Sequence, residues 1–366
     1  MKILAQGINI NEITHALNSP QKGSECDKIY GCLFGGAVGD ALGYPVEFQS
    51  MMGIYGTYGK KGIQLRDIEK IAIVSDDTQM SLFTTAGLIT AFDQKEQKCS
   101  QYYWVDNVWN AYLDWLYTQD QHCKPQKSRG WLADMKEMQV QRAPGNTCLD
   151  MLYQECKGST SCPYNTSKGC GGIMRIAPVG IVLSDIYPDN IAFVDKIGGD
   201  IAALTHGHPL GYIPAAAMTH IISRLISSDM TLEEIVEEAV NQVSEIYKGS
   251  KYIGSFQAII RKAVTLSKSF VPCEMAIKQI GEGWVAEETL AIAVYCSLRY
   301  KNDFVKAVTA AVNYDGDSDS TGAVTGNIMG ALVGLNGIPK KPVEALDLNE
   351  IISTISYQIF QRINAK

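Results

Sequence analysis

Apolar side chains recur at every third or fourth position along most of this chain, and this spacing predicts amphipathic helices. The pattern is clearest in five segments, residues 202–224, 232–247, 252–266, 287–300 and 349–363. Polar residues that favour helix starts precede several predicted helices, among them Asp27, Thr231 and Asp347. We find no convincing apolar–polar alternation of the kind that indicates strands. The pattern therefore predicts an all-α fold, a single compact domain of orthogonal helices.

Glycines recur at regular intervals in two of the predicted helices. Residues 31–43 form a glycine-rich segment, and later in the chain the spacing is four residues, at Gly322, Gly326, Gly330 and Gly334. Each glycine weakens a helix by about 1 kcal/mol relative to alanine, so a glycine face is tolerated mainly where backbones approach closely. We expect the second glycine helix to be central and buried.

Two other stretches differ from the surrounding helical pattern. An aromatic stripe, Trp104, Trp109, Tyr112 and Trp115, has nearly helical spacing and is more typical of a core than of a cofactor site. Residues 118–167 contain several prolines and glycines and are poor in long helices. Loops of this length in a compact domain are often functional.

The first 27 residues stand apart from the helical pattern. They are rich in asparagine and other turn-forming residues, so they fit either a terminus that packs on the domain or an arm that contacts a partner. We therefore divide the chain into an N-terminal extension, residues 1–27, and a helical domain, residues 28–366.

Composition restricts the classes of partner. The chain has 366 residues and a formal net charge of -7, which argues against nucleic acid or an anionic membrane as the main partner.

No apolar run reaches the ~18 residues needed to cross a bilayer. The N-terminus does not resemble a secretory signal, so we expect a cytoplasmic protein. The ten cysteines form no CxxC pair and are expected to be free thiols.

The segment Ser75-Asp76-Asp77-Thr78 carries the first candidate chemistry. Serine and aspartate favour helix N-termini, so helix capping alone explains it. The segment also supplies the oxygen atoms that hard divalent cations prefer.

A second acidic segment lies at the start of the second glycine helix. Asp315, Asp317 and Asp319 alternate along it, as in an EF-hand calcium loop. That loop requires glycine at its sixth position and glutamate at its twelfth, where this chain has Ser320 and Gly326. The EF-hand interpretation fails, and a loop with oxygen ligands at a helix start remains.

Two further elements could complete a site. Asp40 lies near the end of the first glycine-rich segment and Glu47 follows it; a buried cap and a loop acid explain the two residues as well as a functional site does. Gly169, Gly171 and Gly172 lie before a predicted helix, and such a loop can present backbone N–H groups to a phosphate. A zinc site at His206 and His208, or at the cysteines between residues 156 and 170, is disfavoured by the ligand spacing.

Taken in order, these segments resemble the ADP-ribosylglycohydrolase family, which includes arginine-directed ADP-ribosyl hydrolases and dinitrogenase-reductase-activating glycohydrolases. The resemblance covers residues 28–340. It rests on residues 31–47 (GCLFGGAVGDALGYPVE), 75–78 (SDDT), 168–175 (KGCGGIMR), 205–206 (TH) and 316–322 (GDSDSTG). Each segment alone is weak, but their combination and order are specific.

The resemblance implies an all-α fold with two Mg²⁺ ions, or Mn²⁺, in a cleft. The implied metal ligands are Ser75, Asp76, Asp77, Asp317, Asp319 and Ser320, with Glu47 beside them. The implied pyrophosphate contacts are Gly145, Gly169, Gly171 and Gly172, and the implied lining of the ADP-ribose cleft is Ser167, His206, Tyr212 and Trp284.

The implied reaction is hydrolysis of the bond between ADP-ribose and a protein side chain, and the implied substrate is N-linked ADP-ribosylarginine. Two metal ions can bind the ribose hydroxyls and activate water, while Asp76 or Asp77 accepts the proton and Glu47 orients the water. The implied partners are an ADP-ribosylated protein and the product ADP-ribose.

Two alternatives stay open. The chain would act as an immunity protein if its N-terminal extension binds and blocks an ADP-ribosylating toxin, with or without hydrolase activity. Alternatively, it is a related hydrolase that acts on a nucleotide sugar or on ADP-ribosylated nucleic acid, although the negative charge disfavours nucleic acid.

Overall fold

The fold is all-helical over the part of the chain that the structure, a computed structural model, describes: residues 20–94, 100–123 and 129–364. Within these ranges there are no strands, and the β-type contacts are two isolated bridges, Ala72 to Leu346 and Gly169 to Val285. The predicted all-α class is confirmed. None of the helices in these ranges is long and apolar enough to cross a membrane.

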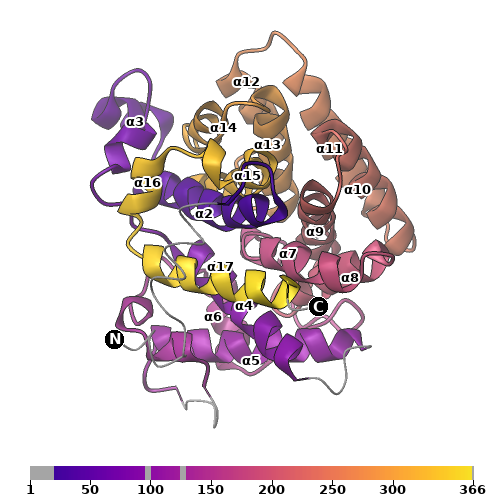
Figure 1. Cartoon of the computed structure of the whole chain (residues 1–366). Helices are drawn as coiled ribbons and strands as arrows, with labels where there is room; N and C mark the ends of the chain where they lie inside the picture. Colours follow the sequence, from indigo (N-terminus) through magenta and orange to yellow (C-terminus); the bar gives the residue numbers. More distant parts are fainter. Residues whose placement is uncertain (1–19, 95–99, 124–128, 365–366) are drawn as a thin grey trace.

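Figure 1 shows how the helices follow one another along the chain. The α-helices are α2 (Glu25–Gly43), α3 (Met51–Tyr58), α4 (Asp76–Asp93), α5 (Gln101–Gln119), α6 (Asn146–Tyr153), α7 (Ala177–Ile186), α8 (Ile191–Ala203), α9 (Pro209–Ser227), α10 (Leu232–Ile246), α11 (Ile253–Ser267), α12 (Cys273–Ile280), α13 (Ala286–Arg299), α14 (Phe304–Val312), α15 (Ser318–Val333), α16 (Lys340–Ala345) and α17 (Asn349–Asn364). Short 3₁₀ helices lie between them: η2 (Tyr44–Val46), η3 (Leu65–Ile68), η4 (Trp131–Asp134), η5 (Lys136–Met138), η6 (Cys170–Gly172) and η7 (Leu335–Gly337).

Helices α2 and α15 pack backbone against backbone in the middle of the molecule (Figure 1). The glycines on the two helices face one another. A Cβ atom added to Gly39 would lie 2.0 Å from the carbonyl oxygen of Gly322, and one added to Gly326 would lie 2.0 Å from that of Gly35. Side chains at these positions would separate the helices. The central, buried position predicted for the second glycine helix is confirmed.

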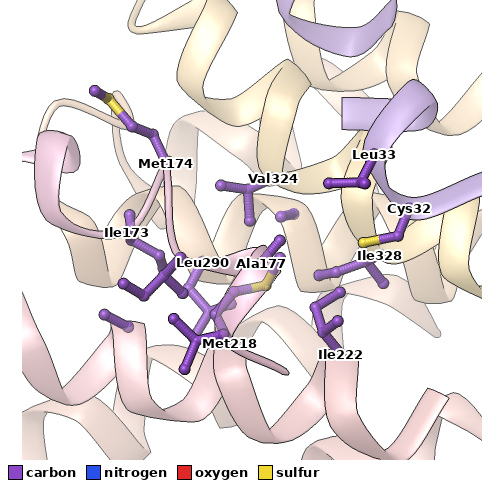
Figure 2. Close-up of a cluster of buried hydrophobic side chains, with 14 of the residues drawn as sticks. Cys32, Leu33, Ile173, Met174, Ala177, Met218, Ile222, Leu290, Val324 and Ile328 are labelled. Carbon is purple, nitrogen blue, oxygen red and sulfur yellow. The ribbon is translucent and has the colours of Figure 1, made fainter. Parts of the chain in front are cut away.

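The apolar core surrounds this helix pair. Figure 2 shows one part of it, where side chains from α2, α7, α9, α13 and α15 meet, among them Leu33, Met218, Ile222, Leu290 and Ile328. The predicted aromatic stripe on α5 also belongs to the core, since Trp104, Tyr112 and Trp115 are fully buried and Trp109 nearly so.

Four of the five helices predicted from periodicity are found within two residues of their predicted ends, as α10, α11, α13 and α17. Thr231 begins α10 as predicted. Its hydroxyl accepts from the Glu234 N–H, and the Glu234 carboxylate accepts from the Thr231 N–H, which forms a capping box.

The fifth helix, predicted for residues 202–224, is wrong as a single element. Helix α8 ends at Ala203 and α9 begins at Pro209, so the intervening residues form a loop that contains His206. Proline lacks an N–H group and disfavours helical backbone at the preceding residue, so Pro209 can begin a helix but not continue one. The Nδ1 atom of His208 caps the new helix by accepting from the Leu210 N–H at 3.0 Å.

Asp27 does not begin its helix, contrary to prediction. Ser24 is the N-cap of α2, and the Asp27 carboxylate instead accepts from the N–H groups of Gly23 and Asn336, at 2.8 and 3.0 Å. Asp27 thereby joins the start of α2 to the segment after α15. Residues 1–19, which make up most of the predicted extension, lie outside the described residues.

Candidate active site

The two acidic segments lie at the N-termini of α4 and α15. Ser75 is the N-cap of α4, where its hydroxyl accepts from the Asp77 N–H at 3.2 Å. Asp317 is the N-cap of α15, where its carboxylate accepts from the Ser320 N–H at 3.2 Å. The capping interpretation of these two residues is therefore correct. The first turns of both helices are buried. Capping by Ser75 and Asp317 does not explain why these turns also carry the buried acids Asp76, Asp77 and Asp319.

Asp40 connects the end of α2 to the start of α4. Its buried carboxylate accepts from the Ser75 N–H at 2.9 Å, and from both the N–H and the hydroxyl of Thr78. The same end of α2 touches α15, because a Cβ atom on Gly43 would lie 2.2 Å from the carbonyl oxygen of Ser318. Helix α2 therefore holds both acidic segments in place.

Asp319 lies at the centre of the acid cluster formed by Glu47, Asp76, Asp77, Asp317 and Asp319. Burial, and then the nearby Asp319 carboxylate, raise the pKa of Asp76, Asp77 and Asp317 well above the usual range. The same two causes, in that order, raise the pKa of Glu47 to about 10. Burial also raises the pKa of Asp319.

Contacts within the cluster explain this coupling. The side chains of Glu47, Asp317 and Ser75 lie close to Asp319. Buried carboxyl groups that lie this close together favour the protonated form, because like charges repel one another. Bound protons therefore offset the mutual repulsion of the acids.

Divalent cations suit this chemistry. The cluster contains only oxygen donors, the buried Oδ2 atom of Asp77 has no hydrogen-bond partner, and a hard cation can replace the bound protons. However, among the described residues no three histidine, cysteine or acidic side chains are already arranged as a metal-binding group. Ser75, Asp76, Asp77, Asp317, Asp319 and Ser320 fit as ligands by type and proximity, and the two-metal cleft stays a prediction.

The glycine loop lies beside the acid cluster. Burial, and then the nearby Asp317 and Asp77 carboxylates, raise the pKa of the Cys170 thiol, so the loop lies close to the start of α15. The loop also packs against His206, because a Cβ atom on Gly171 would lie 3.0 Å from the His206 ring. Cβ atoms added to Gly169 and Gly172 would likewise lie close to the His206 side chain, at 3.3 and 3.5 Å.

His206 has a defined tautomer. The Arg175 guanidinium, which can only donate, donates to the Thr205 hydroxyl at 2.6 Å, and that hydroxyl therefore donates to His206 Nδ1 at 2.8 Å. Burial, followed by the charge of Arg175, lowers the pKa of His206 to about 3. The ring is therefore neutral, with its proton on Nε2, the atom nearest to Gly169.

Gly145, Ser167 and Tyr212, which are also predicted to contact ADP-ribose, lie in different parts of the site region. The Gly145 N–H donates to Asp76 Oδ2 at 3.2 Å, so this glycine contacts the acid cluster. Ser167 lies beside the glycine loop, where its hydroxyl pairs with that of Thr147 at 3.3 Å. Tyr212 is buried against Tyr247, at the end of α10, and its contact with ADP-ribose stays a prediction.

Comparison with known proteins is decisive for the family. The model of the ADP-ribosylglycohydrolase family matches residues 21–365. The chain belongs to this family. The resemblance noted from the sequence is therefore confirmed over nearly the whole chain.

Relatives in the ADP-ribosylglycohydrolase family include two with named activities. The chain is 25% identical to the ADP-ribosylarginine hydrolase Tri1 of Serratia proteamaculans, over 94% of this chain and 83% of the relative. It is 20% identical to the ADP-ribosylhydrolase ARH3 of Bos taurus, over 92% and 93%. A solved structure, an ADP-ribosylglycohydrolase-related protein complex, matches with a TM-score of 0.61 at 21% identity, over 93% of this chain and 99% of that chain, which supports the fold.

Sequence reasoning missed several residues in this family member's site. Arg175 and Thr205 lie within quoted motifs, yet only the structure relates them to His206. Phe48 follows Glu47 directly and stacks on Trp284, with ring centroids 5.3 Å apart. A lone aromatic residue in a loop gives no periodic signal, so this contact could not be read from the sequence.

Proposed function

We propose that this protein is a divalent-metal-dependent hydrolase that releases ADP-ribose from ADP-ribosylated arginine side chains of proteins. Family membership supports a glycohydrolase. The observation that carries the metal proposal is the buried cluster of acids around Asp319, with the unpartnered Oδ2 atom of Asp77. The match to an ADP-ribosylarginine hydrolase over 94% of this chain supports the linkage.

The acids divide into two proposed roles. Asp77, Asp317 and Asp319, with the hydroxyls of Ser75 and Ser320, would hold two Mg²⁺ or Mn²⁺ ions. Bound cations would supply Lewis acidity toward the ribose hydroxyls and the attacking water. They would also favour the ionised carboxylates, since metal binding to protonated ligands releases protons.

Asp76, with Asp77 as the alternative, and Glu47 would act on the water. In the reaction, water adds to the anomeric carbon and the bond from that carbon to the arginine nitrogen breaks. One water proton passes to Asp76 or Asp77, and the arginine nitrogen gains a proton as it leaves. Glu47, which contacts Asp319 from the segment after α2, would orient the water.

ADP-ribose recognition is assigned to the glycine loop and His206. The loop lies beside the acid cluster, and a glycine-rich loop of this kind can present backbone N–H groups to a pyrophosphate. Beside it, the neutral His206 ring offers an Nε2–H donor of fixed orientation. The glycine loop lies close to the start of α15, and His206 packs against the loop. The sugar and phosphate subsites would therefore be adjacent.

The test uses the purified full chain with Mg²⁺ and two matched peptides, one ADP-ribosylated on arginine and one on serine. We expect ADP-ribose release from the arginine peptide, and none after treatment with EDTA. Asp77→Asn should lower kcat by at least ~100-fold, as expected for a group that handles the water or its metal. Calorimetry should show that the variant also binds Mg²⁺ more weakly.

The control is Asp189→Asn, which changes an exposed acid between α7 and α8. It should leave Mg²⁺ binding and activity unchanged, and both variants should unfold cooperatively. Release from the serine peptide alone would refute the arginine assignment. Full activity in EDTA, or full activity of Asp77→Asn, would refute the metal site.

A further inference from the structure

Phe48 lies in an unusual position beside the acid cluster. It follows Glu47 directly, its side chain is 73% exposed, and its backbone has φ +63°. Few residues other than glycine adopt this left-handed conformation, and strain of this kind persists where the surrounding structure imposes it, often at functional sites. A large exposed apolar side chain held in this way adds little to the core.

The partner of Phe48 is Trp284, which belongs to the opposite side of the site. The two rings are stacked, with their centroids 5.3 Å apart and their planes 17° from parallel. Trp284 is half-buried and fixed to the glycine loop, since its carbonyl oxygen accepts from the Cys170 N–H at 3.2 Å. The stack therefore joins the segment that carries Glu47 to the loop that carries Cys170.

Both attachment points reach the acid cluster. The Asp317 N–H donates to the carbonyl oxygen of Glu282, two residues before Trp284, at 2.8 Å, and Glu47, which directly precedes Phe48, lies near Asp319. The aromatic pair thus borders the acids rather than lying on a remote surface. A planar cation at this point would meet aromatic faces beside the acid cluster, and such faces attract cations.

We propose that Phe48 and Trp284 form an aromatic clamp that receives the guanidinium group of ADP-ribosylarginine and sets the preference for that linkage. This inference rests on the proposed function. In the substrate, a guanidinium nitrogen is bonded directly to the reacting anomeric carbon. Its binding group must therefore border the residues that act on that carbon, and Phe48 is covalently adjacent to Glu47.

The chemistry distinguishes linkages. A guanidinium is planar and delocalised, and it stacks on aromatic rings better than other cations do. To admit it, Phe48 moves away from Trp284 and one or both rings take the guanidinium plane. ADP-ribosylserine offers neither a plane nor a charge at this point, so it gains nothing from the clamp.

The experiment measures kcat/KM for the arginine and serine peptides in parallel, with Mg²⁺. Phe48→Leu keeps apolar bulk but removes the aromatic face, and it should lower kcat/KM for the arginine peptide by about 10-fold while leaving any serine cleavage unchanged. Phe48→Tyr keeps the face and should stay within about 3-fold of wild type. Phe270→Leu, at a fully exposed phenylalanine between α11 and α12, is the matched control and should change neither rate.

Each result is decisive. Selective loss in Phe48→Leu together with recovery in Phe48→Tyr supports the clamp. An equal loss on both peptides would mean that the rings hold a shared part of the substrates, such as the adenine, and it overturns the proposal, as does no loss at all. Wild-type protein that cleaves no arginine peptide overturns the proposed function itself, and the clamp with it.

Discussion

At the scale of single residues, the best-defined group in the site is His206. Two hydrogen bonds in series fix it: Arg175 donates to Thr205, and Thr205 donates to the Nδ1 atom, so the ring proton resides on Nε2. The buried arginine also stabilises the neutral ring, because a second positive charge there would be repelled. These surroundings of His206 could not be predicted from the sequence, because the predicted helix 202–224 concealed the loop that carries it.

This tautomer predicts different outcomes for two amide substitutions. In His206→Gln the side-chain amide nitrogen can reach the position of Nε2, whereas in the shorter His206→Asn it can only reach that of Nδ1. We expect His206→Gln to keep ADP-ribose affinity within about 3-fold, and His206→Asn to lose about 10-fold, the effect of one hydrogen bond of ~1 kcal/mol. Isothermal titration calorimetry with ADP-ribose measures both. Equal losses would show that Nε2–H is not the donor.

At the scale of elements, the site depends on the contact between α2 and α15. The acidic segments 75–78 and 317–320 are far apart in sequence, and they meet because the end of α2 holds α4 through Asp40 and touches α15 at Gly43. Glycine spacing made close packing of α15 predictable. It did not reveal the partner helix, because one sequence does not show which two glycine faces match.

Local patterns could be predicted from the sequence, whereas contacts between distant segments could not. Helices with one clear apolar face, such as α10 and α11, were predicted almost to their ends. The break at Pro209 was missed because apolar periodicity continues across it. The acid segments were found as motifs, but Asp319 as their common neighbour and the stack of Phe48 on Trp284 depend on tertiary packing.

The helix contact predicts a large cost for one added methyl group. In Gly39→Ala the new Cβ would lie 2.0 Å from a backbone oxygen of α15, which cannot move without separating the helices. We expect a loss in the free energy of unfolding at or above the ~1–3 kcal/mol typical of overpacking, together with weaker Mg²⁺ binding. Urea denaturation and calorimetry measure these two effects.

Gly254→Ala is the matched control for this helix substitution. Gly254 lies in α11, and a Cβ atom there would meet nothing within 4 Å. Alanine should leave the free energy of unfolding unchanged or raise it by up to ~1 kcal/mol. If the two variants were equally stable, the close approach of α2 and α15 would not exist in solution.

At the scale of the whole molecule, the acid cluster opposes folding in the absence of a cation. The starts of α4 and α15 and the segment after α2 bring their carboxyl groups together, and burial and mutual repulsion raise the pKa values of these groups. Raised values mean that the folded state binds protons that the unfolded state releases at neutral pH, so the cluster lowers stability there. Such a cost is common where function requires like charges to be held together.

This cost predicts that Asp319→Asn stabilises the metal-free protein. The amide removes the central charge, and its Oδ1 atom can still accept from the Ser320 N–H, which lies 2.9 Å from Asp319. In EDTA we expect a Tm about 2 °C or more above wild type, as a gain of ~1 kcal/mol produces in a large domain. Adding Mg²⁺ should reverse the order, because a cation that binds only the folded state at 100 times its Kd adds ~2.7 kcal/mol to wild type.

Differential scanning calorimetry with and without Mg²⁺ tests both halves of this prediction, with Asp189→Asn as the control that should follow wild type in each. Titration of Mg²⁺ in two buffers of different ionisation enthalpy gives the number of protons released, which should fall in Asp319→Asn because one carboxyl has gone. A variant less stable than wild type in EDTA would show that the acids do not repel one another in the folded protein. A Mg²⁺-induced rise in Tm as large as that of wild type would show that Asp319 does not hold the metal, whatever role it has in hydrolysis.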